Sequence, residues 1–239
     1  MKIDVAFLPV TVSSEDSVYI VIDVLRATSA LVKMFEKGTE SIIPVETVEE
    51  AFQLAAQLNP PFLLAGERGG LPIPGFDLDT CLIELEKADL KGKKIVLTTT
   101  NGTKALKSLE NAPFVITGSF LNARSCAEAS FLEAKEMQKG IFIVCAGQNG
   151  NFALCDSVCA GFIIKEILNL GSVEELSDAA WAALALSDFY NDPYLAFKKS
   201  WSGRHLSSLG HEDDLRYCAQ KNTSSIVISF QKGVLKRIK

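Results

Sequence analysis

The sequence has little histidine and no basic excess, and both shortages exclude classes of function. Its 239 residues include two histidines, and 24 Lys and Arg stand against 29 Asp and Glu, giving a formal net charge of −5. A nucleic-acid-binding protein normally carries a basic surplus or stripe. No apolar run approaches the roughly 20 residues of a membrane span, and Asp4 interrupts the run that a signal peptide would need. We therefore expect a soluble, cytoplasmic protein that binds neither nucleic acid nor membrane.

Several catalytic signatures are also missing. The chain has no G-x-x-x-x-G-K-[ST] loop, no G-x-S-x-G elbow and no cysteine followed six positions later by Arg, and neither histidine lies in an Arg-His-Gly sequence. The six cysteines form no Cys-x-x-Cys pair. We expect Cys155 and Cys159, four residues apart, to be small buried side chains on one helix face. Zinc is not expected, because His and Cys do not occur at ligand spacing.

What the sequence does contain is an alternation of apolar, β-branched runs with helical patterns. We expect strands at 17–25, 40–45, 62–66, 93–100, 113–119 and 140–147, and helices at 27–38, 47–58, 101–109, 122–137 and 154–170. The helix at 47–58 begins with a capping box, in which Thr47 is followed by Glu50. This alternation predicts an α/β fold with three layers, in which helices cover a mostly parallel, mixed sheet.

The pattern changes after residue 171. Helices are expected over about 172–220, and a hairpin or pair of edge strands over 224–238. No composition break or repeat divides the chain, so we expect residues 1–239 to form a single domain with a helical excursion at about 172–220. The apolar run AAWAALAL (179–186) leaves a homodimer open, because burial within the chain would explain the run equally well.

Polar residues follow four of the expected strands where each strand ends. Ligands of open α/β sheets bind beyond the carboxyl ends of the strands, so these segments predict one shared pocket. They are Asp23, Arg26, Thr28 and Ser29; Glu67, Arg68, Gly69 and Gly70; Thr98 to Thr103; and Gly147, Asn149, Gly150 and Asp156.

The residue types in this set suit an anionic ligand and a hard metal ion. The segment TTTNGT (98–103) enters a helix with hydroxyls and free amides, which can hold a phosphate or simply cap the helix. Arg26 and Arg68 can each grip phosphate, carboxylate or sulfonate, or form a structural ion pair. Asp23, Glu67 and Asp156 offer oxygen ligands for Mg²⁺, although an acid such as Asp156 in a first helical turn is also a common cap.

The stretch GFDLDTCLIE (75–84) looks like the Asp-x-Asp-Gly-Thr loop of dehalogenase-type phosphatases. That loop directly follows a buried strand, whereas RGGLPIPG precedes it here, and the glycine after the second Asp is missing. We therefore expect Asp77 to belong to a long functional loop over 66–80 and not to be a nucleophile.

Taken together, these segments resemble the 2-phosphosulfolactate phosphatase family along nearly the whole chain. The matching stretches are VIDVLRATSAL (21–31), IPVETVEEA (43–51), LLAGERGG (63–70), GFDL (75–78), LTTTNGTKAL (97–106), GSFLNA (118–123), VCAG (144–147), FALCDSVCAG (152–161), SDAA (177–180) and HEDDLRYCA (211–219). The resemblance implies a three-layer fold of the family's own type. It also implies Mg²⁺-dependent hydrolysis of 2-phospho-3-sulfolactate to 3-sulfolactate and phosphate, a step toward coenzyme M.

The resemblance also assigns roles to residues of this chain. It implies catalytic roles for Asp23, Arg26, Glu67 and Arg68, and metal ligation by Asp23, Glu67 and Asp156. Substrate contacts are implied for Thr28, Ser29, Gly69, Thr99, Thr100, Asn101, Gly102, Thr103 and Gly147. Whether water or Asp23 itself attacks phosphorus is left open.

The sequence departs from the family pattern in two places. Asp79-Thr80-Cys81-Leu82 stands where Gly-Asn-Ser-Pro is typical, and Cys155 stands where Glu is typical. These departures keep a second hypothesis in view, a non-catalytic protein that binds an anionic, phosphorylated metabolite.

Overall fold

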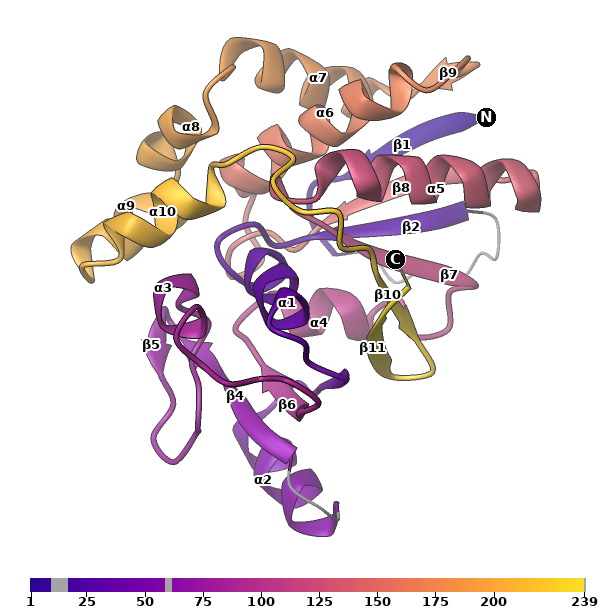
Figure 1. Ribbon diagram of the computed structural model, residues 1–239. Coiled ribbons are helices and arrows are strands. Elements are labelled where there is room, and N and C mark those ends of the chain that lie inside the picture. The colour runs from indigo at the N-terminus through magenta and orange to yellow at the C-terminus, as the bar shows by residue number, and fades with distance from the viewer. Residues whose placement is uncertain (10–16, 59–61, 239) are drawn as a thin grey trace.

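The computed structural model describes residues 1–9, 17–58 and 62–238 (Figure 1). The strands within these ranges are β1 (Lys2–Ala6), β2 (Ser17–Ile22), β3 (Ser41–Pro44), β4 (Phe62–Arg68), β5 (Leu71–Pro72), β6 (Lys94–Thr98), β7 (Phe114–Gly118), β8 (Gly140–Cys145), β9 (Glu175–Leu176), β10 (Ile228–Gln231) and β11 (Val234–Arg237). The helices are α1 (Ala27–Glu36), α2 (Val48–Gln57), α3 (Leu82–Leu85), α4 (Gly102–Lys107), α5 (Ala123–Met137), α6 (Leu154–Leu168), α7 (Asp178–Phe189), α8 (Pro193–Lys199), α9 (Trp201–Ser208) and α10 (Glu212–Cys218). The predicted α/β class is confirmed; that the whole chain forms a single domain stays a prediction.

Local sequence signals account for most of these elements. Five of the six residues of β2 are buried, as expected of a β-branched run covered on both faces. The capping box of α2 is present, with the Glu50 amide donating to Thr47 Oγ1 at 3.0 Å. Strand β1 was not predicted. The apolar pattern that would predict this strand is short, because Ile3 and Val5 are its buried residues and the other residues of the strand are not buried.

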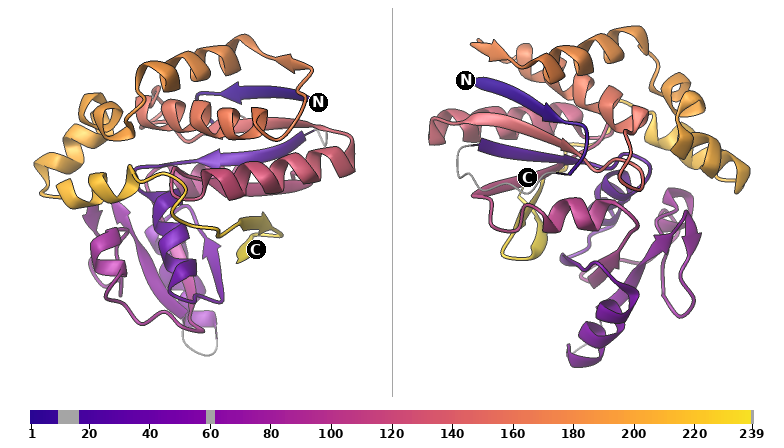
Figure 2. Two further views of the ribbon diagram at one scale, coloured as in Figure 1. Left: turned by 45° about the horizontal axis from the view of Figure 1, so that its top comes forward. Right: turned by 180° about the vertical axis from the view of Figure 1, so that it is seen from behind.

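All strands of the described residues belong to one sheet, in the order β5-β4-β6-β3-β11-β10-β7-β2-β8-β1-β9. Two groups of parallel strands can be recognised in it, β4-β6-β3 and β7-β2-β8-β1-β9. The β10–β11 hairpin lies between the groups and runs antiparallel to its neighbour on each side, β7 and β3 (Figure 2). A hairpin was expected over 224–238, but it occupies the middle of the sheet and not an edge.

The twist of the sheet brings the carboxyl ends of the two groups together. Three successive antiparallel pairings separate β7 from β3, so the groups run in nominally opposite directions. Between β2 and β6 there are five strand-to-strand steps, which at about 20–25° each accumulate a rotation of about 100–125°. Subtracting this rotation from a full reversal of direction leaves the directions of β2 and β6 roughly 55–80° apart. Their carboxyl ends therefore converge. Figure 1 shows β4 rising steeply toward the end of β2.

Helices flank the sheet and extend beyond it. Helix α5 packs against β7, β2 and β8, α6 packs on α5, and α7 lies on α6 and β1. The contact between α6 and α7 is close, since a Cβ at Gly161 would lie 2.0 Å from the Ala183 carbonyl oxygen. Helices α8, α9 and α10 reach past the end of β2 toward α3, as Figure 1 shows.

The apolar residues of α7 are buried on one side of the helix and exposed on the other. Ala180, Ala183 and Leu184 are buried, whereas Trp181 and Phe189 are 60% and 80% exposed. Burial within the chain therefore explains only one side of this helix, and homodimerisation stays a prediction. Within the described ranges, no helix has both the length and the apolar character that crossing a bilayer demands.

Candidate functional site

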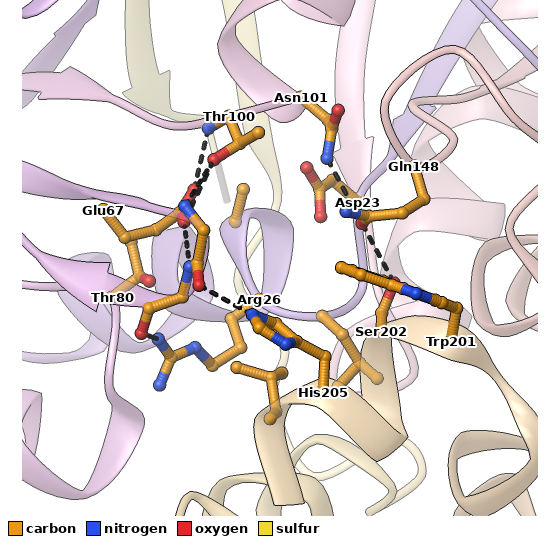
Figure 3. A pocket seen from close by; sticks show the side chains of 15 residues that line it. Asp23, Arg26, Glu67, Thr80, Thr100, Asn101, Gln148, Trp201, Ser202 and His205 are labelled. Carbon is orange, nitrogen blue, oxygen red and sulfur yellow. Dashed lines mark hydrogen bonds between the residues drawn. The ribbon is translucent and has the colours of Figure 1, made fainter. Parts of the chain in front are cut away.

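A pocket lies where the carboxyl ends of the two strand groups converge. The enclosed cavity is small, ≈ 40 Å³, and it opens to solvent at its mouth. Figure 3 shows Glu67 and Thr100 across the pocket from Trp201 and Ser202. The pocket is lined by Asp23, Leu25, Arg26, Ala27, Glu67, Gly69, Gly70, Thr80, Thr100, Asn101, Gln148, Trp201, Ser202, His205 and Leu206.

Asp23 is the most deeply placed carboxylate of the lining. It directly follows β2 and is 7% exposed. Burial raises its pKa well above the ordinary value, and the charges of Asp156 and Glu67 raise it further, while hydrogen bonds from the amides of Ala27 and Gly102 act in the opposite direction. Gly102 is required at this contact, because a Cβ there would lie 2.8 Å from Asp23 Oδ2. The chain thus holds an acid that is expensive to ionise at the wall of the pocket.

Glu67, in β4, is fixed by the loop that follows β6. Its Oε1 accepts the Thr100 amide at 2.7 Å, and its Oε2 accepts the Gly70 amide at 2.7 Å and the Thr100 hydroxyl at 3.1 Å. The TTTNGT amides predicted to cradle a phosphate therefore hold the two carboxylates instead, Thr100 on Glu67 and Gly102 on Asp23. Any direct contact of this loop with substrate stays a prediction.

Arg26 lines the pocket but is already paired. Its Nη1 lies 2.5 Å from Asp214 Oδ2, with both side chains 1% exposed, and its Nη2 donates to the Gly70 carbonyl at 3.0 Å. The other oxygen of Asp214 accepts the amides of Leu82 and Ile83 at 2.9 and 3.2 Å. This is the structural ion pair that the sequence left open as an alternative, and it joins α1, α3 and α10.

The remaining predicted residues lie behind the pocket wall. Arg68 points away and donates to Thr98 Oγ1 at 2.7 Å and to the carbonyl oxygens of Glu46 and Glu67. Thr99 and Thr103 bond each other reciprocally through amide and hydroxyl. Of the predicted site, Asp23, Arg26, Glu67, Gly69, Thr100 and Asn101 share the lining, whereas Thr28, Ser29, Arg68, Thr99, Gly102, Thr103, Gly147 and Asp156 do not.

Asp156 joins two strand ends from below the pocket. Its Oδ1 accepts the Val24 amide at 2.9 Å and its Oδ2 accepts the Gly147 amide at 3.2 Å, so each oxygen already has a partner. Burial raises the pKa of this carboxyl to about 7, although the two amide bonds favour the ionised form. Its role as a metal ligand stays a prediction.

These raised pKa values predict that the metal-free protein loses stability as pH rises. A carboxyl whose pKa is higher in the folded than in the unfolded state binds its proton more tightly when folded. Its contribution is complete below the unfolded pKa of about 3.9 and is lost as pH rises through the folded value, which is about 7 for Asp156.

Urea unfolding with EDTA between pH 5 and 8 measures this effect. Asp156→Asn is the comparison, because its amide does not titrate. We expect the free energy of unfolding to fall with pH more steeply in the native sequence than in the variant. Equal slopes would show that Asp156 does not titrate as its burial requires.

Side chains of α9 complete the pocket and were not predicted to belong to the site. Trp201, Ser202, His205 and Leu206 come from the helical region expected over about 172–220, in which no site residue was predicted. Ser202 Oγ donates to Gln148 Oε1 at 3.1 Å and so ties α9 to the loop after β8. The available signal is a Trp and a His spaced i, i+4 after the N-cap Ser200, which places both on one helix face.

Asp77 lies outside the pocket lining. Its Oδ2 accepts the Leu64 amide at 2.8 Å, so the side chain fixes the 66–80 segment against β4. This placement agrees with the expectation that Asp77 is not a nucleophile. The neighbouring Thr80 does reach the pocket.

The three acids proposed as metal ligands do not form a preassembled trio. Among the described residues, ligand atoms meet within 4.8 Å in one group of three, Cys81, His211 and Asp214. The Arg26 guanidinium already neutralises Asp214 in that group, which disfavours a second cation there. Asp23 and Glu67 face the pocket without such a partner. This suits Mg²⁺, which is usually held by one or two carboxylates together with water and substrate phosphate.

Comparison with known proteins agrees with the pattern of the sequence. The sequence model of the 2-phosphosulpholactate phosphatase family matches residues 7–233. The chain is a member of the 2-phosphosulpholactate phosphatase family. A relative from Caldicellulosiruptor saccharolyticus is 40% identical over 94% of this chain and 93% of its own. Relatives from Clostridium perfringens strain 13 (38%, over 100% and 97%) and Deinococcus radiodurans (37%, over 98% and 95%) are similar. All three are named probable 2-phosphosulfolactate phosphatase.

Both departures noted from the 2-phosphosulpholactate phosphatase family pattern lie beside the pocket. Cys155 is buried next to Asp156, and the charges of Asp156 and Asp23, added to burial, raise the pKa of its thiol. Cys81 precedes α3, where its Sγ lies 3.5 Å from Asp214 Oδ1. Both thiols are therefore protonated at neutral pH and act as small packing groups.

Proposed function

We propose that this protein is a Mg²⁺-dependent phosphatase of 2-phospho-2-hydroxy acids such as 2-phospho-3-sulfolactate. The observation that carries the proposal is that Asp23 and Glu67, from opposite strand groups, face one pocket. Family membership and the names of the relatives support phosphate-ester hydrolysis on that substrate class. A cytoplasmic location and a role toward coenzyme M belong to the same proposal.

The charge of the lining supports the need for a cation. Two carboxylates face the space, while Arg26 is already paired with Asp214. A phosphate dianion entering beside Asp23 and Glu67 would be repelled unless a positive charge came with it. Bound Mg²⁺ would neutralise phosphoryl oxygens and polarise the ester. Asp23 and Glu67 are the residues that would hold it.

The chain itself supplies fixed positions and a base. The amides of Thr100 and Gly70 hold Glu67, and those of Ala27 and Gly102 hold Asp23, so neither carboxylate needs to reorganise when substrate binds. A bound cation would favour the ionised form of Asp23, whose carboxylate could then accept a proton from an attacking water. Direct attack by Asp23 is the alternative, and a phosphoenzyme trapped by acid quench during turnover would reveal it.

The decisive experiment measures phosphate release from 2-phospho-3-sulfolactate with Mg²⁺ and with EDTA. We expect turnover only with the metal. A non-catalytic binder of a phosphorylated metabolite, the second hypothesis, would show ligand-dependent thermal stabilisation without phosphate release.

Glu67→Gln tests the metal assignment separately. We expect it to raise the Mg²⁺ concentration for half-maximal activity by at least about 10-fold, because a carboxylate ligand is lost and the Thr100 and Gly70 amides lose part of their acceptor. Glu49→Gln, an exposed change on α2, is the matched control and should leave the titration unchanged. An unchanged midpoint in Glu67→Gln would remove Glu67 from the metal site.

A further inference from the structure

The wall of the pocket formed by α9 carries a basic side chain that the proposed chemistry does not use. His205 Nε2 lies 2.8 Å from the Gly69 carbonyl oxygen. A carbonyl only accepts hydrogen bonds, so Nε2 carries the proton, and the other ring nitrogen, Nδ1, has no partner among the described residues. Figure 3 shows the ring at the pocket, bonded to the backbone across from its own helix.

Packing holds this ring in one orientation. Trp201 stacks on it with the ring centroids 4.8 Å apart and the planes 19° apart. The other constraint is the Gly69–Gly70 turn, where φ is +59° and +80°, and where a Cβ at Gly70 would lie 3.9 Å from His205 Cδ2. An acid group bound at Nδ1 needs a donor there, so the ring would bind it with a proton on both nitrogens. His205 is thus positioned as a receptor for a negative group.

The other positive charges near the pocket are already occupied. Arg26 is paired with Asp214, and Arg68 is bonded behind the wall. In the described part of the chain, His205 is therefore the basic residue of the lining that has no carboxylate partner. Asp23 and Glu67 lie on the other side, where they would hold the metal and the phosphoryl group. A substrate with a second acid group needs a positive contact away from that side.

Gln148 offers a neutral donor on the loop after β8, which Ser202 ties to α9; Figure 3 shows it next to Asp23 and Asn101. The Asn149 amide donates to Asn101 Oδ1 at 3.0 Å, which leaves Asn101 Nδ2 to donate to Gln148 Oε1 at 3.4 Å. Ser202 donates to the same oxygen. The Gln148 Nε2 group, which has no partner among the described residues, is left as a donor at the pocket.

We propose that His205, stacked on Trp201 and assisted by Gln148, binds the second acid group of the substrate and selects phosphomonoesters that carry a carboxylate or sulfonate near the ester carbon. The inference rests on the proposed phosphatase function. It makes His205 a specificity-determining residue and assigns it no part in breaking the phosphate ester.

Two substrates with the same carbon skeleton test the assignment. In 2-phospholactate a carboxylate occupies the place of one methyl group of isopropyl phosphate. His205→Gln retains a side-chain N–H for the Gly69 carbonyl and removes the imidazole nitrogen that would bind the acid group. We expect it to raise KM for 2-phospholactate about 10- to 100-fold, the usual effect of one lost charged hydrogen bond, with kcat and the kinetics on isopropyl phosphate within about 2-fold. His205→Lys, which returns a cation, should recover most of the loss.

Arg204→Gln is the matched control, because it removes a positive charge from an exposed position of the same helix. It should leave both substrates unaffected. Equal losses on the two substrates, or a loss confined to kcat, would overturn the proposal, as would an unchanged KM in His205→Gln.

Binding without turnover separates this idea from the phosphatase itself. Calorimetric titration with 3-sulfolactate, which has the acid groups but no phosphate, should give about 10- to 100-fold weaker binding to His205→Gln than to the native protein. If the native protein releases no phosphate from any ester, the phosphatase proposal fails while this titration still decides the role of His205. Equal affinity of the two proteins, or no binding to either, would overturn the role of His205.

Discussion

Asp23→Asn is expected to lower kcat for phosphate release by at least about 10³-fold. The carboxylate is the buried acid of the pocket, and both roles open to it, metal ligand with base or direct nucleophile, require a negative oxygen at that position. Removing a group of this kind typically costs 10²–10³ or more in rate. Phosphate release under saturating 2-phospho-3-sulfolactate and Mg²⁺ measures the loss.

The same substitution should leave the protein folded. Asp23 faces the charges of Asp156 and Glu67 in a buried setting, so ionised Asp23 opposes folding at neutral pH. An amide of the same shape removes that repulsion, at the cost of one acceptor for the amides of Ala27 and Gly102. In EDTA we expect a melting temperature equal to or above that of the native protein, which distinguishes a lost catalyst from a lost fold.

Asp77→Asn is the matched control, because it belongs to the segment that looks like a dehalogenase-type nucleophile loop. Its carboxylate holds the Leu64 amide and does not face the pocket, so activity should stay within a few-fold of native. If Asp77→Asn abolished turnover while Asp23→Asn did not, the catalytic assignment would have to move to the 66–80 segment.

Asp214→Ala is expected to destabilise the fold by about 3–5 kcal/mol, the usual cost of leaving a buried charge without its partner. The change strands the Arg26 guanidinium, which is 1% exposed, and removes the acceptor for the amides of Leu82 and Ile83. Urea unfolding monitored by circular dichroism measures the loss.

Two further variants separate the pair from general effects. Asp213→Ala removes the adjacent, exposed carboxylate of α10 and should change stability by no more than about 0.5 kcal/mol. The double change Arg26→Met and Asp214→Leu should regain much of the lost stability, because no buried charge is left alone. A loss below about 1 kcal/mol in Asp214→Ala would mean that Arg26 is free to serve substrate, as the family resemblance implies.

The alternation of strands and helices could be predicted from the sequence, because buried parallel strands and amphipathic helices differ in the spacing of their apolar residues. β2 and α2 were therefore anticipated from local sequence. The division of the sheet was not, because the pairing of β10 with β7 and β11 with β3 depends on contacts between distant residues such as Leu235 and Ile42. The prediction that strand ends converge held, although two strand groups brought together by twist produce the convergence and not one parallel sheet.

Part of the site could also be predicted, because the ends of the strands can be located in the sequence. Asp23 and Glu67 stand immediately at strand ends, where position alone signals a ligand site. The pairing of Arg26 with Asp214 could not be predicted from the sequence, because an Arg that follows a strand can either form a structural ion pair or bind substrate. His205 and Trp201 carry no strand-end signal, because they reach the pocket only through the docking of α9 and α10 against α3 and the Gly69–Gly70 turn.

The central position of the β10–β11 hairpin determines when the sheet can be completed during synthesis of the chain. In the described residues, the strand groups that contribute Asp23 and Glu67 are joined within the sheet by residues 228–237, so this seam cannot close on the ribosome before residue 237 has been synthesised. Until then, β3 and β7 each have one strand edge whose backbone groups lack the hairpin as hydrogen-bonding partner. Such distant pairing is slow, which makes this protein a candidate for chaperone dependence during translation.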